Sequence, residues 1–160
     1  MGMPESVVGT PNVSLVASEE GIEDTPVTSP INEITNAGLT EKMLYLYDTL
    51  LEQSESDPER DIIGPFMVKP CKETYPDYYR FIKNPMDMET IKKRIKSSSY
   101  KTFKKFKSDV TLMFENCKAY NDPTAILHQD ACELQKIFNK VRNATDYIFG
   151  LMHLLKDFFR

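Results

Sequence analysis

Apolar residues recur at three- and four-residue spacing over most of the chain from Leu39 onward, and this spacing predicts amphipathic helices. The first predicted helix begins at Leu39, with Thr40 as its cap. A short helix follows a cap at Asp87, a third carries a strong apolar stripe over 103–120, and a fourth begins near Leu127. No segment alternates with the period of a strand. The pattern therefore predicts an all-α domain, most simply an up-down four-helix bundle.

A long apolar segment between the first two predicted helices fits neither period. Its sequence, IIGPFMVKPCKETYPDYYRFIKNP, contains Pro65, Pro70, Pro76 and Pro85. Proline at these intervals excludes a long helix. The segment is too rich in aromatic and aliphatic residues to be disordered, and long loops inside compact domains are usually functional when they are ordered. We therefore expect a loop that takes part in a binding site.

The two ends of the chain differ from the predicted bundle, which we place at 39–143. Residues 1–38 contain six acidic residues and no Lys or Arg, and their few apolar residues follow no period, so we expect a disordered acidic Ser/Thr/Pro tail. Residues 144–160 are very apolar and are expected to form a C-terminal helical extension. This extension either lengthens the last helix or packs back on the bundle; otherwise it is an exposed apolar patch.

Composition narrows the function classes. The net charge of −4 excludes a polycation that binds nucleic acid along its whole length, although the part after residue 38 carries +2. The cysteines are Cys71, Cys117 and Cys132, an odd number at wide spacing, which argues against a disulfide framework and for a reducing compartment. We expect no secretory signal at the N-terminus, and no apolar run reaches membrane-spanning length, so no membrane contact is expected.

An enzymatic function has little support in the sequence. His128 and Cys132 are four residues apart and can share a helix face. As zinc ligands they lack further partners at suitable spacing, and as a nucleophile and base they lack an orienting carboxylate and an oxyanion donor pair. We expect a protein that is not an enzyme and that uses no cofactor and no metal.

The bundle topology brings two connections to the same end. In an up-down bundle, the long Pro-rich loop after the first helix and the short NDPTA break after the third meet there, and such a meeting can form a small pocket. Asn121, just after the apolar stripe, would be the polar group on its floor. The residues expected to supply the walls are Phe66, Val68, Tyr75, Tyr78 and Tyr120.

Such a pocket favours a neutral, elongated ligand with one amide carbonyl. The Asn121 amide would donate a hydrogen bond worth about 0.5–1.5 kcal/mol net to that carbonyl. A free ammonium would lose its water without gaining a counterion, which costs several kcal/mol. The pocket would therefore select an acylated lysine over a free one. The alternative for Asn121 is a simple helix stop in a structural scaffold.

The blocks YPDYYRFIKNPMDMETIKKRI, YKTFKKFKSDVTLMFENCKAYNDP and AILHQDACELQKIF occur in the order and spacing of a known family. Through them, residues 39–143 resemble a bromodomain, the acetyl-lysine reader module. The spacing of the loop is similar to bromodomains of chromatin-remodelling subunits, polybromo-like or Brahma-like. The resemblance implies a left-handed four-helix bundle.

The resemblance also implies a role for each residue around the pocket. Asn121 would anchor acetyl-lysine, Tyr78 would hold its carbonyl through an ordered water, and Leu127 would take the gatekeeper position. The positions implied for the wall and the shelf are Tyr120, Cys117, Val68, Tyr75, Pro65 and Phe66. One position departs from the pattern, because Gly64 stands where many bromodomains carry Trp, and this predicts a lower shelf and a more open groove.

The partners implied are acetylated histone tails or other acetylated proteins. The resemblance also implies a nuclear protein that regulates transcription as a monomer within a larger chromatin complex. An alternative function rests on the basic 92–107 stretch, which could contact DNA phosphates on a nucleosome and give a weak, salt-dependent affinity. Its residues are Lys92, Lys93, Arg94, Lys96, Lys101, Lys104, Lys105 and Lys107. The simpler interpretation of this stretch is a solvated helix face.

Overall fold

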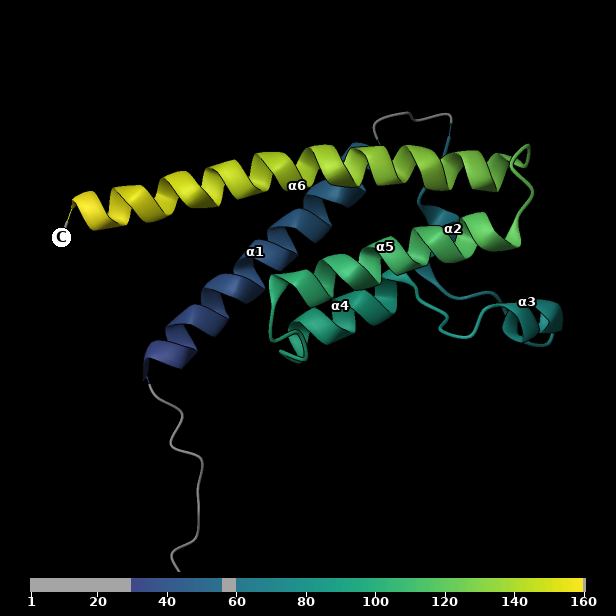
Figure 1. Ribbon diagram of the computed structural model, residues 1–160, viewed down its shortest axis with the longest axis horizontal. Helices are drawn as coiled ribbons and strands as arrows, with labels where there is room; N and C mark the ends of the chain where they lie inside the picture. Colours follow the sequence, from purple (N-terminus) through teal and green to yellow (C-terminus); the bar gives the residue numbers. More distant parts are fainter. Residues whose placement is uncertain (1–29, 56–59, 160) are drawn as a thin grey trace, which may run out of the picture.

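The computed structural model describes residues 30–55 and 60–159, with side chains described from residue 37 onward. These residues form six helices and no strand (Figure 1). The helices are α1 Pro30–Ser54, α2 Gly64–Met67, α3 Pro76–Phe81, α4 Met88–Lys96, α5 Phe103–Tyr120 and α6 Ile126–Phe158. The bundle consists of α1, α4, α5 and α6, while α2 and α3 interrupt the long connection between α1 and α4. The predicted all-α four-helix fold is confirmed.

The first helix begins at Pro30, nine residues before the predicted start at Leu39. The prediction that Thr40 caps this helix is wrong, because Thr40 lies inside α1. Pro30 occupies the first helical position, where the fixed φ of proline and its missing N–H are both tolerated. Of the predicted acidic tail, residues 1–29 lie outside the described residues, and residues 30–38 belong to α1.

The hydrophobic core lies between α5, α6 and α1. Phe106 and Phe114 on α5 pack edge-on against Phe138 on α6, with ring centroids 6.5 and 6.4 Å apart, and all three are fully buried. Leu46 and Leu50 of α1 are also buried in this cluster. Each such side chain contributes about 1.5–3 kcal/mol through burial. The apolar stripes seen in the sequence are therefore the faces that the bundle buries.

The long connection between α1 and α4 contains two short helices that the sequence pattern did not predict. Pro65 lies in the first turn of α2, and Pro76 is the first residue of α3. Proline is tolerated in a first turn but prevents a helix from continuing through it, so each helix is only one or two turns long. Figure 1 shows α3 lying at the edge of the bundle, away from α1.

Asp87 joins this connection to the bundle. It is the N-cap of α4, as predicted, and its carboxylate accepts the backbone N–H of Thr90 at 2.6 Å. The same carboxylate accepts the backbone N–H of Lys69, 18 residues earlier, at 2.9 Å. Burial alone would raise the pKa of Asp87, but the hydrogen bonds from Thr90 and Lys69 outweigh it and hold the pKa of this carboxyl below its usual range. Asp87 is therefore ionised and serves two segments at once.

Two further hydrogen bonds hold the same connection from the side. The hydroxyl of Tyr79 donates to the carbonyl of Pro70 at 2.5 Å, and the amide of Asn116 on α5 donates to the carbonyl of Asn84 at 2.8 Å. A chain with so many prolines has few backbone N–H groups to offer to regular structure. Side chains from α3 and α5 satisfy its carbonyls instead.

A buried carboxylate ties α4 to α5. Asp109 is almost fully buried and accepts hydrogen bonds from the guanidinium of Arg94, from Lys105 at 2.9 Å and from the hydroxyl of Tyr100 at 2.9 Å. Burial opposes its charge, but these donors hold the pKa of Asp109 below its usual range. Two members of the basic 92–107 stretch are thus used inside the fold.

The apolar C-terminal residues continue the last helix. Of the alternatives for 144–160, the structure has the first, since α6 runs without a break to Phe158 and extends past the rest of the bundle (Figure 1). Near residue 146 it contacts α1 through the ion pair of Lys42 with Asp146, at 2.6 Å, and the ring contact of Tyr45 with Phe149, at 6.1 Å. None of the helices in the described ranges is long and apolar enough to cross a membrane.

Replacing Asp87 by Asn tests its role in stability. The variant keeps the size of the side chain but loses the charge that the Lys69 and Thr90 N–H groups favour, so the free energy of unfolding should fall by about 2 kcal/mol at neutral pH. Because the pKa of Asp87 is lowered in the folded state, this contribution is present above the ordinary carboxyl pKa and is lost as the pH falls. Urea unfolding at neutral pH and near pH 3 measures both effects.

The matched control is Asp77→Asn, because Asp77 pairs with Arg80 at 3.3 Å on the surface, where their side chains are 77% and 84% exposed. This variant should change the free energy of unfolding by less than about 1 kcal/mol. Equal effects of the two substitutions at neutral pH would contradict the role given to Asp87.

Candidate binding pocket

A pocket of about 380 Å³ lies where the α1–α4 connection meets the short link between α5 and α6. Its volume is in the range of small-ligand sites. The residues that line it are Pro65, Phe66, Val68, Lys69, Pro70, Tyr75, Tyr78, Met86, Met113, Cys117, Tyr120, Asn121 and Leu127. Residues far apart in the sequence therefore meet at this end of the bundle, as the up-down topology predicts.

The structure brings together all nine residues named from the sequence, namely Asn121, Tyr78, Tyr120, Leu127, Phe66, Val68, Tyr75, Cys117 and Pro65. Sequence reasoning missed four lining residues: Lys69, Pro70, Met86 and Met113. Met113 lies in the apolar stripe of α5, and both Met113 and Met86 are buried. A buried residue that also lines a cavity has the same sequence pattern as any other core residue, which explains these omissions.

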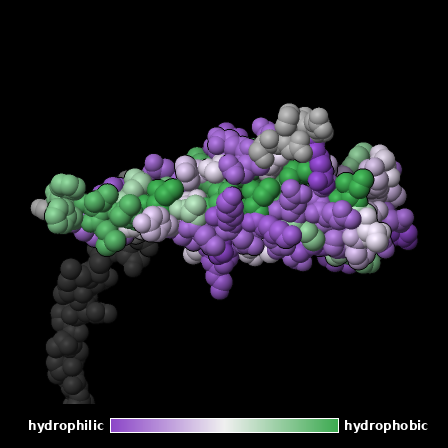
Figure 2. Space-filling view, turned by 90° about the horizontal axis from the view of Figure 1, so that it is seen from above, coloured by the Kyte–Doolittle hydropathy of each residue, from purple (hydrophilic) through white to green (hydrophobic). Residues whose placement is uncertain are grey.

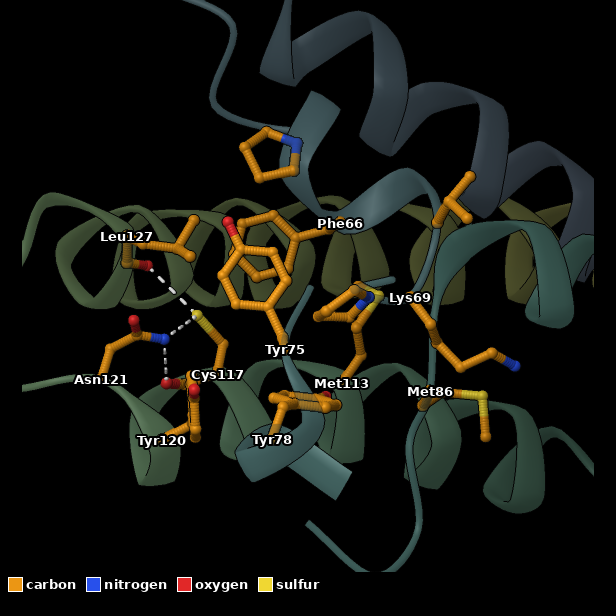
Figure 3. Close-up of a pocket in the computed structure, with 13 residues that line it drawn as sticks. Phe66, Lys69, Tyr75, Tyr78, Met86, Met113, Cys117, Tyr120, Asn121 and Leu127 are labelled. Carbon is orange, nitrogen blue, oxygen red and sulfur yellow. Dashed lines mark hydrogen bonds between the residues drawn. The ribbon is translucent and has the colours of Figure 1, made fainter. Parts of the chain in front are cut away.

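Asn121 both ends a helix and points a side chain at the pocket. Its backbone is extended, with φ −102° and ψ 144°, and its N–H donates to the carbonyl of Cys117 at 3.0 Å, which closes α5. Its side-chain Nδ2 donates to the same carbonyl at 2.9 Å and lies 3.5 Å from the Sγ of Cys117 (Figure 3). The two alternatives for Asn121, a helix stop and a pocket group, are thus compatible in one residue.

Tyr78, on α3, forms an aromatic wall of the pocket. Its side chain is buried, and its ring meets Tyr120 and Tyr79 edge-on, at centroid distances of 5.1 and 5.3 Å. Burial raises the pKa of Tyr78 to about 12, with smaller contributions from Tyr79, Cys117 and Asp87. Its hydroxyl is therefore protonated at physiological pH and can both donate and accept a hydrogen bond.

The mouth and the shelf are made by the connection. Val68 and Tyr75 line the pocket but are more than half exposed, so they lie at its entrance. Phe66 is buried and packs edge-on against Phe114 of α5, with ring centroids 6.0 Å apart, which fixes the shelf to the core.

Gly64, the position that departs from the family pattern, lies against the side chain of Asp61. The carboxylate of Asp61 accepts the N–H of Gly64 at 2.7 Å, at the start of α2. A Cβ on residue 64 would collide with that carboxylate. A side chain at 64 would therefore require the carboxylate of Asp61 to move.

Charge is distributed unevenly around the pocket. None of the described lining residues is Asp or Glu, and Lys69 is the one with a formal charge. The Nζ of Lys69 donates to the hydroxyl of Thr90 at 3.1 Å and lies 3.6 Å from the carboxylate of Asp87, so its charge is paired outside the cavity. Figure 3 shows Lys69 and Met86 on one side of the pocket and Asn121, Cys117 and Leu127 on the other. The interior offers no counterion to a cationic ligand.

Cys117 is part of the wall and not a reactive thiol. It is buried, and its Sγ donates to the carbonyl of Leu127 at 3.3 Å. Burial raises the pKa of Cys117 to about 11, against a smaller opposing effect of the hydrogen bond from Asn121. The thiolate is therefore scarce at neutral pH. Across the described residues, no group of three or more His, Cys, Asp and Glu is placed to hold a metal ion.

The bromodomain is the family whose sequence model matches this chain, over residues 47–133. The chromatin structure-remodeling complex subunit rsc4 of Schizosaccharomyces pombe is 34% identical over 119 residues, which cover 72% of this chain and 22% of that protein. The histone acetyltransferase GCN5 of Yarrowia lipolytica is 38% identical over 84 residues, covering 52% of this chain and 18% of that protein. The transcription regulatory protein SNF2 of Saccharomyces cerevisiae is 33% identical over 113 residues, covering 71% of this chain and 6% of that protein.

The chain belongs to the bromodomain family, as the sequence resemblance predicted. Bromodomains are binding modules that read acetylated lysine in chromatin, and the relatives include chromatin-remodelling subunits as well as an acetyltransferase. The chain spans only about a fifth or less of the length of these relatives, so the similarity concerns the module and not their whole activity.

The labelling rates of the cysteine thiols test whether the pocket wall formed by Cys117 is buried. Two variants each keep one of the cysteines Cys71 and Cys117, with Ser at the other two positions. Because Cys71 is exposed while Cys117 is buried with a raised pKa, an aromatic disulfide reagent near neutral pH should label Cys117 more slowly, by more than about tenfold. Similar labelling rates of the two folded variants would contradict the burial of Cys117.

Proposed function

We propose that this chain is a chromatin-targeting module of the nucleus that binds acetylated lysine, most directly on histone tails, and that it is not itself an enzyme. The observation that carries the proposal is the side chain of Asn121, a hydrogen-bond donor placed in a cavity that contains no carboxylate. An amide carbonyl on a long apolar stem is the ligand chemistry that fits such a cavity.

The hydrogen bonds of Asn121 support a carbonyl ligand. The Nδ2 group carries two N–H donors. One is used by the carbonyl of Cys117 at 2.9 Å, and the other has only the sulfur of Cys117 at 3.5 Å, which is a weak acceptor. An acetyl oxygen is a better acceptor than a thiol sulfur, so binding would improve this second hydrogen bond by about 0.5–1.5 kcal/mol net. The first bond meanwhile keeps the amide oriented.

The aromatic wall supports the rest of the ligand. The hydroxyl of Tyr78 is protonated and can hold a water that bridges to the acetyl oxygen, in the role that the family resemblance implies. Tyr120, Leu127 and Phe66 would enclose the methyl group and the aliphatic stem. The more exposed Val68 and Tyr75 would contact the peptide near the entrance.

Charge selects the acetylated form over the free lysine. An unmodified ammonium would leave water for a cavity whose described lining holds no acidic residue, and its desolvation would cost several kcal/mol. Lys69 adds a like charge at one side. With only a small side chain as ligand, at most about 1 kcal/mol per heavy atom is available, so one site should bind with a Kd between roughly micromolar and millimolar. Useful targeting would therefore need a second contact from a larger chromatin complex.

An NMR titration with matched acetylated and unacetylated histone-tail peptides tests the proposal. Acetylated peptides alone should shift the signals of Tyr78, Asn121 and Leu127. The Asn121→Ala variant should remain folded and bind at least about tenfold more weakly, because the acetyl oxygen would lose its partner.

The control for that titration is Asn139→Ala, since Asn139 is an exposed residue of α6 outside the pocket. It should bind like the wild-type chain. A folded wild-type chain that binds no acetylated peptide would refute the proposal. If Asn121→Ala changed stability by about 1 kcal/mol but left binding intact, Asn121 would be a helix cap alone.

A weak DNA contact remains a second candidate because part of the basic 92–107 stretch is exposed and, among the described residues, unpaired. Arg94 and Lys105 bind Asp109, and Lys93 lies 3.4 Å from Glu89. Lys96, Lys101 and Lys104 are exposed, and none of them forms an ion pair with another described residue. Three free cations can supply a sequence-independent, salt-dependent attraction to phosphates but little more.

Replacing Lys96, Lys101 and Lys104 by Glu should separate the two functions. Acetylated-peptide affinity should stay within about twofold of wild type, because these residues do not line the pocket, while nucleosome affinity at low salt should fall. Fluorescence anisotropy with labelled peptide and with labelled nucleosomes measures both. Loss of peptide binding in the folded triple variant would show that the basic stretch and the pocket are not independent.

A further inference from the structure

The C-terminal end of α6 carries a large apolar face that its own bundle does not cover. Beyond the contact of Phe149 with Tyr45, every described residue from 150 to 159 is exposed. Figure 2 shows that apolar residues cover much of the surface at this end of the molecule. We define the α6 end patch as the exposed large apolar residues between 147 and 159: Tyr147, Ile148, Leu151, Met152, Leu154, Leu155, Phe158 and Phe159.

The spacing within the α6 end patch is that of helices that pack against one another. Ile148, Leu151, Leu155 and Phe158 follow one another at intervals of three, four and three residues, which is the a/d repeat of a coiled-coil seam. The remaining members of the patch stand beside these four and widen the apolar face. The opposite side of the helix carries Gly150, His153, Lys156 and Asp157. The segment is thus an amphipathic helix, with a polar face for solvent and an apolar face that can contact a partner.

The area of the patch is sufficient for a stable association. Its eight residues are between 38% and 81% exposed. At about 200 Å² for a large apolar side chain, they leave on the order of 900 Å² accessible. A standard protein interface buries about 800 Å² on each partner, whereas the apolar patches of a monomer rarely exceed a few hundred Å².

The charges of the segment favour a second copy over a lipid surface. Between residues 150 and 159 the formal charges are Lys156 and Asp157, which cancel, and His153 lies 3.4 Å from Asp157. Two identical neutral helices can approach without repulsion. An amphipathic helix that binds an anionic membrane instead carries Lys and Arg along its polar face, and residues 150–159 contain a single Lys and no Arg.

We propose that the α6 end patch is the interface of a homodimer, in which two copies of this chain pack the ends of their α6 helices against each other about a two-fold axis. A two-fold interface uses the same patch on both copies, so it closes and buries both faces at once. The proposal departs from the monomeric state expected from the sequence, which cannot show that the apolar tail projects away from its own bundle.

The dimer would leave both pockets accessible. Leu127, in the pocket, and Ile148, in the α6 end patch, are 21 residues apart in one continuous helix, which corresponds to about 30 Å. Given the proposed acetyl-lysine binding, one dimer would then present two pockets and gain affinity for doubly acetylated targets. The dimer itself does not depend on that function, since no residue of the patch lines the pocket.

Analytical ultracentrifugation of the full 160-residue chain at roughly 1 to 100 μM tests the proposal. The fraction of chains in a reversible dimer rises with concentration. The expected mass rises with concentration from the 18.4 kDa of one chain towards twice that value. The double variant Leu151→Glu and Leu155→Glu should remain a monomer throughout. Its circular dichroism and its acetylated-peptide binding should match those of wild type, because the patch makes no contact that the bundle needs.

The control is Gly150→Glu, which adds a single carboxylate, one fewer than the double variant, next to the patch but on the solvent side, where a Cβ would meet no atom within 4 Å. It should dimerise like wild type. A wild-type chain that stays monomeric at the highest concentration would overturn the proposal, as would open-ended aggregation, or equal disruption by Gly150→Glu and the double variant. Binding of the monomer to phosphatidylcholine–phosphatidylserine vesicles would assign the patch to lipid instead.

Discussion

The pocket depends on the carboxylate of Asp87, which holds an irregular, proline-rich connection against a regular helix. One oxygen caps α4 through Thr90, and the other accepts the backbone N–H of Lys69, next to the residues that form the shelf and the entrance. The four prolines of this segment limit its helices to the short α2 and α3, so much of its backbone lies outside regular structure. It is kept in place by side chains of the bundle, and the pocket exists because these few hydrogen bonds hold an apolar loop above the end of α5.

Asn121, like Asp87, has two structural roles in one side chain. The side chain that ends α5 is also the donor in the cavity, because the Nδ2 group has one N–H for the carbonyl of Cys117 and one to spare. The stop of a helix therefore fixes the orientation of a binding group without any additional element. In the proposed function, selectivity would follow from the surroundings, because the described lining has aromatic, aliphatic and sulfur-containing side chains but no carboxylate. Neutralising a lysine by acetylation removes the penalty that this environment imposes on a cation.

Much of this arrangement could be predicted from the sequence, and the limits have physical causes. The stripes on α5 and α6 predicted the bundle, and the family resemblance named nine residues that the structure gathers around one pocket. The early start of α1 at Pro30 was missed because the residues before Leu39 show no apolar period, and Met113 was missed because a pocket wall and a core have the same pattern. The direction of the apolar end of α6 could not be predicted at all, because periodicity shows that a face is apolar but not what covers it.

The central claim is that the second N–H of Asn121, whose partner here is only the sulfur of Cys117, receives the carbonyl of acetyl-lysine. The most direct measurement is a crystal structure of the chain with a peptide that carries one acetylated lysine. The account predicts the acetyl oxygen about 3 Å from Nδ2 of Asn121, with the hydrogen bond to the carbonyl of Cys117 retained and the aliphatic stem between Leu127 and the loop. An acetyl group bound outside the pocket, or inside it with Nδ2 still directed only at Cys117, would contradict the account.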